Sequence, residues 1–217
     1  MVNQAMATRL QFCYSGAVYD VLRVKGYKNQ TLPGYIQPLN IEQVVAGEVF
    51  TIEGQLTDNL DDNDTLLKWC ELLSKIPSDV VVICQPNDNS LAHMGELSAE
   101  TLTLKKVKGY IVDGGCRDSA FISKLGFPVF CKYYTPKDIV GKWAASSFAK
   151  DIIIGGVTIK NGDYVIADRD GCVIIPADII ENVLTETEKV LNTENLVRKA
   201  ILQGIDPVEA YLKYGKF

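Results

Sequence analysis

The stretch DVVVICQPNDNSLAHMGELSAETLTLKKVKGYIVDGGCRDSAFISKLGFPVFCKY, residues 79–133, decides the fold of this chain. It contains three short apolar runs, at 79–84, 109–113 and 128–133. The first run is apolar at nearly every position, which is typical of a strand buried on both faces. Residues 95–107 have a helical composition, and SAFISKLG predicts a short helix ended by its glycine. The resulting β-α-β-α-β pattern favours parallel strands joined by right-handed crossovers.

The segments before this stretch add helices and one more strand. Residues 13–25 carry apolar side chains at helical spacing, and GEVFTIEG (47–54) predicts a strand between glycines. TLLKWCELLSKI, which follows an acidic turn, predicts a helix with Asp64 as its cap.

The segments after it change in character. Beyond Asp151, the turn dipeptides Asn161-Gly162 and Asp170-Gly171 separate β-branched runs, which predicts an antiparallel ribbon. A helix is expected from Ala177 to about Gln203, and a last short helix at PVEAYLKYG. We therefore predict one compact α/β domain over residues 1–217, with a parallel section and a later antiparallel ribbon.

Composition narrows the class of protein. Apolar residues make up 47% of the 217, charged residues 23%, and the net charge is −5, which is a globular balance without a basic footprint for nucleic acid. Six cysteines form no C-x-x-C pair, which argues against a zinc site or disulfide framework and favours a reducing, cytoplasmic setting. The first residues lack a signal-peptide core, and no apolar run reaches membrane-spanning length.

Candidate chemistry gathers at the carboxyl ends of two predicted strands, where open α/β sheets bind ligands. Gly95-Glu96 opens a helix after the first strand, and Gly114-Gly115-Cys116-Arg117-Asp118 follows the second. If the strands are neighbours, both loops face one crevice. Free N–H groups at a helix start and a guanidinium suit a substrate carboxylate, and carboxylates suit a hard divalent cation.

Simpler roles fit the same residues. Asp118 could cap the helix at Ser119, Arg117 could pair with a surface carboxylate, and Glu96 could be an ordinary first-turn acid. Spacing alone leaves these readings about even with the functional one. We interpret His93, the only histidine, as a loop or capping residue without a catalytic part, and Cys116 as a packing residue because no second histidine could activate it.

The segment GYIVDGGCRDSAFISKLGFPVFCKYYTPKDIVGKW resembles the signature region of the RraA-like family. That family contains 4-hydroxy-4-methyl-2-oxoglutarate aldolases, oxaloacetate decarboxylases and regulators of ribonuclease E. Further similar segments are SGAVYDVL, GEVFTIEG, IIIGGVTIKNGDYVIADRDGCVIIP, and TENLVRKAI with AYLKYG. The resemblance implies a layered α/β/β/α fold of the swivelling β/β/α type. It also implies a homotrimer or hexamer, with the C-terminal helices, 177–217, at the subunit interface.

The resemblance also implies roles for individual residues. Asp118 matches the aspartate that holds Mg²⁺ or Mn²⁺, and Arg117 the arginine that binds the keto acid and stabilises the enolate. The backbone amides of Gly95, Glu96, Leu97 and Ser98 match those that take the substrate carboxylate. Glu96 also stands where the aldolases place an aspartate that supports the metal through water. Glu194 is the candidate for an acid that reaches the metal from a neighbouring subunit.

The function implied is a metal-dependent lyase of pyruvoyl compounds. It would cleave a 4-hydroxy-2-oxo acid by retro-aldol reaction, decarboxylate oxaloacetate, or both, through a metal-stabilised pyruvate enolate. The alternative is a non-catalytic regulator that binds an RNA-processing enzyme. The regulator branch tends to have glycine at position 96 and an acid at position 121, whereas this chain has Glu96 and Phe121. A family member that keeps the fold but has lost efficient chemistry is a third possibility.

Overall fold

A computed structural model describes residues 4–57 and 60–216 of the chain. The predicted core is present: β3 (Val80–Gln85), α4 (Glu96–Leu104), β4 (Gly109–Val112), α5 (Ser119–Leu125) and β6 (Val129–Cys131). The three strands are parallel neighbours, with Val81 opposite Gly109 and Ile111 opposite Phe130. All three are buried throughout apart from the end of β3. The parallel β-α-β-α-β prediction is therefore confirmed.

The large sheet grows outward from this core on both sides. Its order is β1-β6-β4-β3-β2-β11-β12, and β8 pairs with the far end of β2. The added strands are β1 (Gln37–Pro38), β2 (Val45–Leu56), β8 (Trp143–Phe148), β11 (Tyr164–Asp168) and β12 (Gly171–Ile175). Only β2 joins in parallel, to β3, and the other four are antiparallel to their neighbours. The sheet is thus mixed, as expected.

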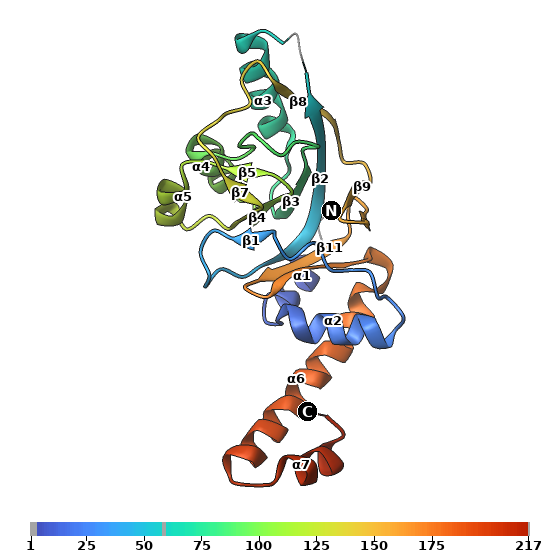
Figure 1. Cartoon of the computed structure of the whole chain (residues 1–217). Coiled ribbons are helices and arrows are strands. Elements are labelled where there is room, and N and C mark those ends of the chain that lie inside the picture. The colour runs from blue at the N-terminus through green and yellow to red at the C-terminus, as the bar shows by residue number, and fades with distance from the viewer. Residues whose placement is uncertain (1–3, 58–59, 217) are drawn as a thin grey trace.

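Helices and a hairpin cover the sheet in layers (Figure 1). Helix α3 (Asp62–Lys75) joins α4 and α5 on one face, over a core that includes the fully buried Trp143. On the other face lies the hairpin of β9 (Ile152–Ile154) and β10 (Val157–Ile159). Helices α1 (Gln4–Leu10) and α2 (Ser15–Val24) pack with the start of α6 on β11 and β12. The predicted layered single domain is confirmed.

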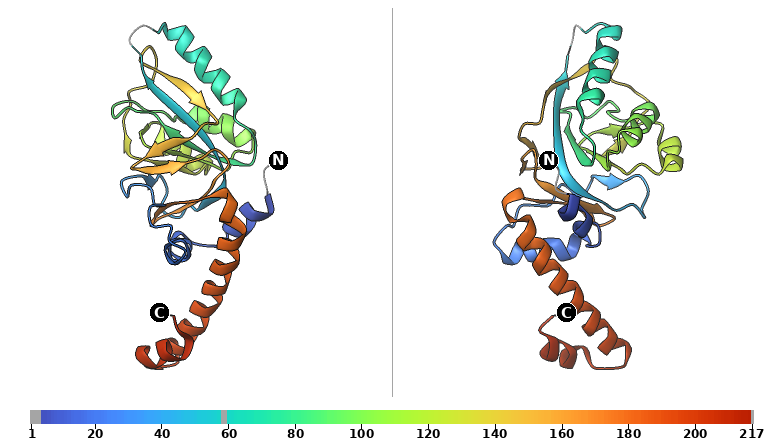
Figure 2. Two further views of the ribbon diagram at one scale, coloured as in Figure 1. Left: turned by 90° about the vertical axis from the view of Figure 1, so that its right-hand side faces the viewer. Right: turned by 180° about the vertical axis from the view of Figure 1, so that it is seen from behind.

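The C-terminal helices leave this body (Figure 2). A 3-10 turn, Ala177–Ile179, leads into α6 (Ile180–Leu202), and α7 (Pro207–Tyr214) folds back on its far end. Leu202 and Leu212 there are 81% and 77% exposed. The subunit interface expected at these helices stays a prediction, because the structure contains one chain. In the part of the chain that the structure describes, each helix is too short or too polar to cross a membrane.

The predicted antiparallel ribbon is present, because β11 and β12 pair across the turn that contains Asp170. Two local expectations need correction. The hairpin between β9 and β10 turns at Gly155-Gly156, where φ is +58° and +80°, as a two-residue turn of this kind requires. Asn161-Gly162 instead joins β10 to β11, which lie in different sheets, and the Asn161 side-chain oxygen accepts a hydrogen bond from the Thr51 N–H.

The start of α3 also differs from the prediction. Asp61, not Asp64, is the N-cap, and its carboxylate accepts from the N–H groups of Asn63 and Asp64. The sequence offers several acids in a row, so any of them satisfied the capping preference and only the backbone geometry distinguishes them. The position of α3 matters because this helix forms one wall of the cleft described next.

Candidate functional site

The loops after β3 and β4 meet, as their neighbouring positions in the sheet require. Cys84 lies opposite Val112 in the parallel ladder, and a bridge between Ala92 and Gly115 joins the two loops directly. A cleft of about 440 Å³ opens between them and α3. Its lining includes Gly95, Glu96, Leu97, Ser98, Arg117 and Asp118. The six residues that the sequence singled out at these two loops are therefore brought together.

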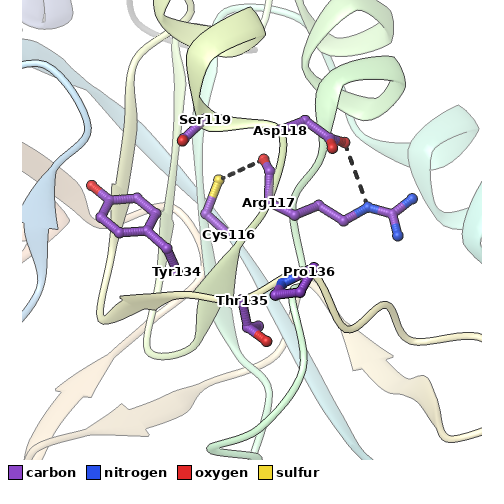
Figure 3. A pocket seen from close by; sticks show the side chains of 7 residues that line it. All are labelled: Cys116, Arg117, Asp118, Ser119, Tyr134, Thr135 and Pro136. Atoms are coloured by element: carbon purple, nitrogen blue, oxygen red, sulfur yellow. Dashed lines mark hydrogen bonds and ion pairs between the residues drawn. The ribbon is translucent and has the colours of Figure 1, made fainter.

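The turn that carries Arg117 and Asp118 is held against the start of α4. The two-residue strand β5 (Gly115–Cys116) pairs with β7 (Tyr133–Tyr134), and the Arg117 N–H donates to the Met94 carbonyl at 2.9 Å. Asp118 has φ +55° and ψ +31°, a left-handed conformation that aspartate tolerates better than most residues. The left-handed residue turns the chain sharply between β5 and α5, and the Arg117 and Asp118 side chains extend to the same side of this turn (Figure 3).

The Asp118 carboxylate caps the helix opposite, not its own. It makes no cap bond to α5, and Oδ2 instead accepts from the Glu96 N–H of α4 at 3.1 Å. A Cβ on Gly95 would lie 2.8 Å from that same oxygen and 3.3 Å from Arg117 Nε. The capping role expected at Ser119 is thus replaced by a carboxylate at the positive end of α4, and position 95 must be glycine for it to sit there.

Arg117 lies between two carboxylates. Its Nε is 3.5 Å from Asp118 Oδ2, and its Nη1 is 3.1 Å from Asp138 Oδ2. All three side chains are between 37% and 46% exposed, so they border solvent. The simpler reading of Arg117, a pair with a surface carboxylate, is therefore present in part. Asp138 was missed: it stands in a loop after β7, and no motif in the sequence connects it with Arg117.

The first turn of α4 keeps unused donors. The Leu97 and Ser98 N–H groups lie four residues after His93 and Met94, which precede the helix, and the Met94 carbonyl already accepts from Arg117. The helix itself therefore gives these two N–H groups no acceptor. The Ser98 hydroxyl is used in packing, because it accepts from the Trp69 indole N–H at 2.9 Å. The backbone of this turn is thus suited to an anion.

Gly114 and Gly115 allow close packing and do not adopt a left-handed backbone conformation. A Cβ on Gly114 would lie 2.7 Å from His93 Nδ1, and one on Gly115 would lie 2.5 Å from the Leu91 carbonyl oxygen. Neither glycine has a positive φ. The space that a side chain would need at these two positions is filled by the preceding loop and by Tyr133.

His93 lines the floor of the cleft and is 1% exposed. Its Nε2 lies 3.5 Å from Asp88 Oδ2, and neither ring nitrogen has a hydrogen-bond partner among the described residues. Burial lowers the pKa of His93 to about 4, against an opposing effect of Asp88, so the ring is neutral near pH 7. It packs edge-on against Trp143 at 5.0 Å. These contacts fit a packing histidine.

Cys116 is also a packing residue. Its side chain is fully buried beside a second hollow, of about 350 Å³, which also borders Arg117 and Asp118 (Figure 3). A hydrogen bond with Cys131, together with burial, raises the pKa of the Cys116 thiol. A protonated, buried thiol is a poor nucleophile, which agrees with the prediction.

Glu194 lies elsewhere within the single chain. It is on α6, which extends away from α3 and α4 (Figure 1), and its carboxylate accepts from the Tyr14 hydroxyl and lies 3.5 Å from Lys216 Nζ. The structure therefore does not bring Glu194 to the Asp118 of its own chain. A role toward a neighbouring subunit stays a prediction.

The donor set at the cleft suits a loosely held magnesium ion. Across residues 4–57 and 60–216, no group of three or more His, Cys, Asp or Glu side chains could form a protein cage for a metal. Mg²⁺ is usually held by one or two carboxylates, with waters and substrate completing its octahedron. The half-exposed Asp118 and the neighbouring Glu96, both on the cleft lining, provide that kind of set.

This chain is similar in sequence to known proteins. The profile of the RraA-like family, described as Aldolase/RraA, matches residues 15–174. A protein of Halalkalibacterium halodurans, named "Putative 4-hydroxy-4-methyl-2-oxoglutarate aldolase", is 31% identical over 182 residues. The match covers 84% of this chain and 83% of that protein.

Two solved structures share the architecture. An uncharacterized protein from Pseudomonas syringae pv. tomato has a TM-score of 0.87 and 21% identity, covering 97% of this chain and 94% of its own. A Streptomyces coelicolor protein, described as an unusual member of the RNase ES inhibitor RraA family, has a TM-score of 0.82 and 21% identity, covering 92% and 99%. At these identities the likeness shows the fold alone.

Proposed function

The chain belongs to the RraA-like family, and from this premise we propose that it is a divalent-metal-dependent lyase of pyruvoyl compounds. The observation that carries the proposal is the contact among three residues of the cleft. Arg117 and Asp118 reach the N-terminus of α4 together, so closely that a Cβ at position 95 would lie 2.8 Å from the Asp118 carboxylate. A cation, a carboxylate and free amides at one point form a site for a 2-oxo acid and its counter-ion.

The chain's own residues would bind and stabilise negative charge on the substrate. The substrate carboxylate would take the free N–H groups of Leu97 and Ser98, and the Arg117 guanidinium would donate to the 2-oxo oxygen as it gains charge. In retro-aldol cleavage the C3–C4 bond breaks, its electron pair stays on C3 as the pyruvate enolate, and C4 leaves as an aldehyde. The C4 hydroxyl proton goes to water. In decarboxylation CO₂ leaves instead, and in both cases C3 then takes a proton.

Asp118 and Glu96 would hold the divalent ion, Mg²⁺ or Mn²⁺. When bound, such an ion supplies Lewis-acid polarisation of the 2-oxo group. Glu96 is one methylene longer than the aspartate expected at this position in the aldolases. We propose that it therefore acts through water and that Asp118 is the direct ligand.

Assembly and location belong to the same proposal. We propose a homotrimer or hexamer in which Glu194 reaches the site of a neighbouring subunit, acting in the cytoplasm on a small keto acid, without nucleic acid or membrane. The exposed apolar side chains of α6 and α7 support such an assembly, because a lone chain would leave them in water.

The test is release of pyruvate from oxaloacetate and from 4-hydroxy-2-oxopentanoate, followed in the presence of Mg²⁺ and against Mg²⁺ in buffer without protein. We expect turnover that disappears with EDTA and returns with Mg²⁺ or Mn²⁺. Asparagine also tolerates the left-handed backbone and keeps an acceptor oxygen, but it lacks the charge. In Asp118→Asn, added Mg²⁺ or Mn²⁺ should therefore not restore turnover. Turnover that survives EDTA, or persists in Asp118→Asn, would contradict the metal-dependent mechanism.

A regulator of an RNA-processing enzyme is the second candidate. It is favoured by the fold shared with the Streptomyces coelicolor protein described as an RNase ES inhibitor family member. It predicts that the protein binds a ribonuclease and inhibits RNA cleavage, and that Asp118→Asn leaves this effect unchanged. Pyruvate release without such inhibition would favour the lyase.

A further inference from the structure

The cleft has two chemically different halves. One half holds Arg117 and its carboxylates. The other is an apolar wall, made by Leu66, Trp69, Cys70 and Leu73 on α3, with Ile139 and Val140. On α3 these four side chains recur at spacings of three and four residues, so they form one continuous stripe along the helix. The polar reactions described above use none of them.

The wall is fixed in place. The Trp69 indole N–H donates to Ser98 Oγ at 2.9 Å, and its ring meets Trp143 edge-on at 6.1 Å between centroids. The hydrogen bond ties α3 to the same first turn of α4 that presents the free amides. A substrate carboxylate held at α4 would therefore have its far end directed along a wall of defined position.

Among the described residues of one chain, the charges of the cleft leave no partner for a second carboxylate. Of the described residues that line it, Arg117 alone carries a positive charge, since His93 is buried and neutral. Three acids, Glu96, Asp118 and Asp138, line it as well. Arg117 already lies between two of those acids. A substrate with a carboxylate at its far end would meet a negative and apolar surface there.

We propose that the preferred substrates are 4-hydroxy-2-oxo acids with an uncharged alkyl or aryl group on C4, and not dicarboxylates. The proposal rests on the lyase function and specifies its substrate class. The reaction is the retro-aldol cleavage already written: C3–C4 breaks, pyruvate is formed, and the apolar group leaves on the aldehyde. The apolar wall then provides the contact that a dicarboxylate would lack.

Turnover of two matched compounds tests the preference. Pyruvate release is measured from 4-hydroxy-2-oxo-4-phenylbutanoate, which also yields benzaldehyde, and from 4-hydroxy-2-oxoglutarate, at equal Mg²⁺. We expect kcat/KM to be about tenfold or more higher for the phenyl compound, the usual size of discrimination by an apolar pocket. Equal values, or a preference for 4-hydroxy-2-oxoglutarate, would overturn the proposal.

Two neighbouring leucines provide a matched pair of variants. Leu66 lines the cleft and Leu67 does not, yet both lie on α3 and are 50% and 54% exposed. Leu66→Arg adds a cation to the wall and should shift the kcat/KM ratio about tenfold toward the dicarboxylate, whereas Leu67→Arg should leave the ratio unchanged. Cys70→Lys, also exposed and on the wall, should act as Leu66→Arg does if that variant folds poorly.

Binding separates failure of this proposal from failure of the lyase. Isothermal titration calorimetry with Mg²⁺ compares 2-oxo-4-phenylbutanoate with 2-oxoglutarate, neither of which has a C4 hydroxyl to cleave. We expect the phenyl compound to bind about tenfold more tightly. This preference without any turnover would reject the lyase and keep the apolar pocket. Turnover with a reversed preference would do the opposite, and absence of binding by either compound would reject the pocket.

Discussion

Two pairs of a basic and an acidic side chain have the same separation but different surroundings: both members of one pair line the cleft, whereas only the histidine of the other pair does. Arg117 Nε lies 3.5 Å from Asp118 Oδ2, and His93 Nε2 lies 3.5 Å from Asp88 Oδ2. The first pair is more than one third exposed, whereas the side chains of the second are 0% and 2% exposed. Arginine keeps its charge in any environment, while burial lowers the pKa of His93 to about 4. Only the first pair is therefore ionic near pH 7.

The two aspartates also differ in where their hydrogen-bond donors lie. Asp88 is satisfied locally, by the N–H groups of Ser90 and Leu91 and the Ser90 hydroxyl, so it shapes the loop before α4. Asp118 takes its N–H from another element, Glu96 of α4, and so joins two loops across the cleft. Asp118 is thus part of the site itself, whereas Asp88 supports the loop beside it.

The largest effect should come from the exposed pair. Arg117→Lys keeps the charge but loses the planar fork that reaches both Asp118 and Asp138. We expect kcat/KM for pyruvate release to fall about 10²–10³-fold, the usual cost of removing one donor at a developing oxyanion. Arg169→Lys, at an exposed turn, is the matched control. Activity of Arg117→Lys close to wild type would remove Arg117 from the reaction.

Gly95→Ala tests the closeness of the pair to α4. The added Cβ would lie 2.8 Å from Asp118 Oδ2, so the carboxylate must turn away from the Glu96 N–H. Because the clash involves the end of a side chain, we expect little loss of stability but about a tenfold or greater loss of kcat/KM. Gly34→Ala is the control, since a Cβ there meets nothing within 4 Å. Equal activity of the two variants would show that the observed Asp118 position is not the working one.

The parallel core was predictable because its signals are local. Three apolar runs and two helical segments alternate between residues 79 and 133, and the crossover rule then orders the strands. Arg117 and Asp118 were found for the same reason, since they follow a strand directly. The roles of Glu96 and Asp118 toward a metal came from family resemblance, and the structure leaves them as proposals.

What sequence could not provide is contact between distant loops. Asp138 reaches Arg117 only because β7 returns the chain beside β5, and no local pattern encodes that return. Of the two predicted turns, the one at Asp170-Gly171 joins the paired strands β11 and β12, but Asn161-Gly162 closes no hairpin. Gly155-Gly156 has turn composition as well, and only strand pairing decides which of these turns closes a hairpin. The sequence also does not show why glycine stands at positions 114 and 115, because the atoms that exclude a side chain there belong to the preceding loop and to Tyr133.

Asp138→Asn tests the second carboxylate beside Arg117, where we expect a smaller effect on activity. The variant removes the charge and keeps one side-chain oxygen, which can accept from Arg117 Nη1 or from the Val140 N–H, whereas Asp138 accepts from each through a separate oxygen. The pair is partly exposed and so screened by solvent, and we expect kcat/KM to fall only about twofold to fivefold. The loss should shrink at high salt, which would be measured at 0.05 and 0.5 M NaCl, roughly a threefold change in Debye length. A loss as large as that of Arg117→Lys would give Asp138 a direct role with substrate.

The smallest effect on activity is expected at the buried pair, and there the effect on stability takes over. His93→Gln should change kcat/KM at pH 7.5 less than about threefold, because a neutral, buried ring supplies no charge that the reaction could use.

The pKa of His93 in the folded chain is about 4, below its ordinary value of 6.5, so between these values the unfolded chain binds a proton that the folded chain does not. The free energy of unfolding must then fall as the pH is lowered from about 6.5 to about 4, by up to roughly 3 kcal/mol. The lowered pKa of Asp88 acts at more acidic pH, outside this window. Urea unfolding across the window should show the slope in the wild type and a flatter one in His93→Gln. The same slope in both proteins would mean that His93 titrates normally in the folded chain, and the contrast between the two pairs would then be lost.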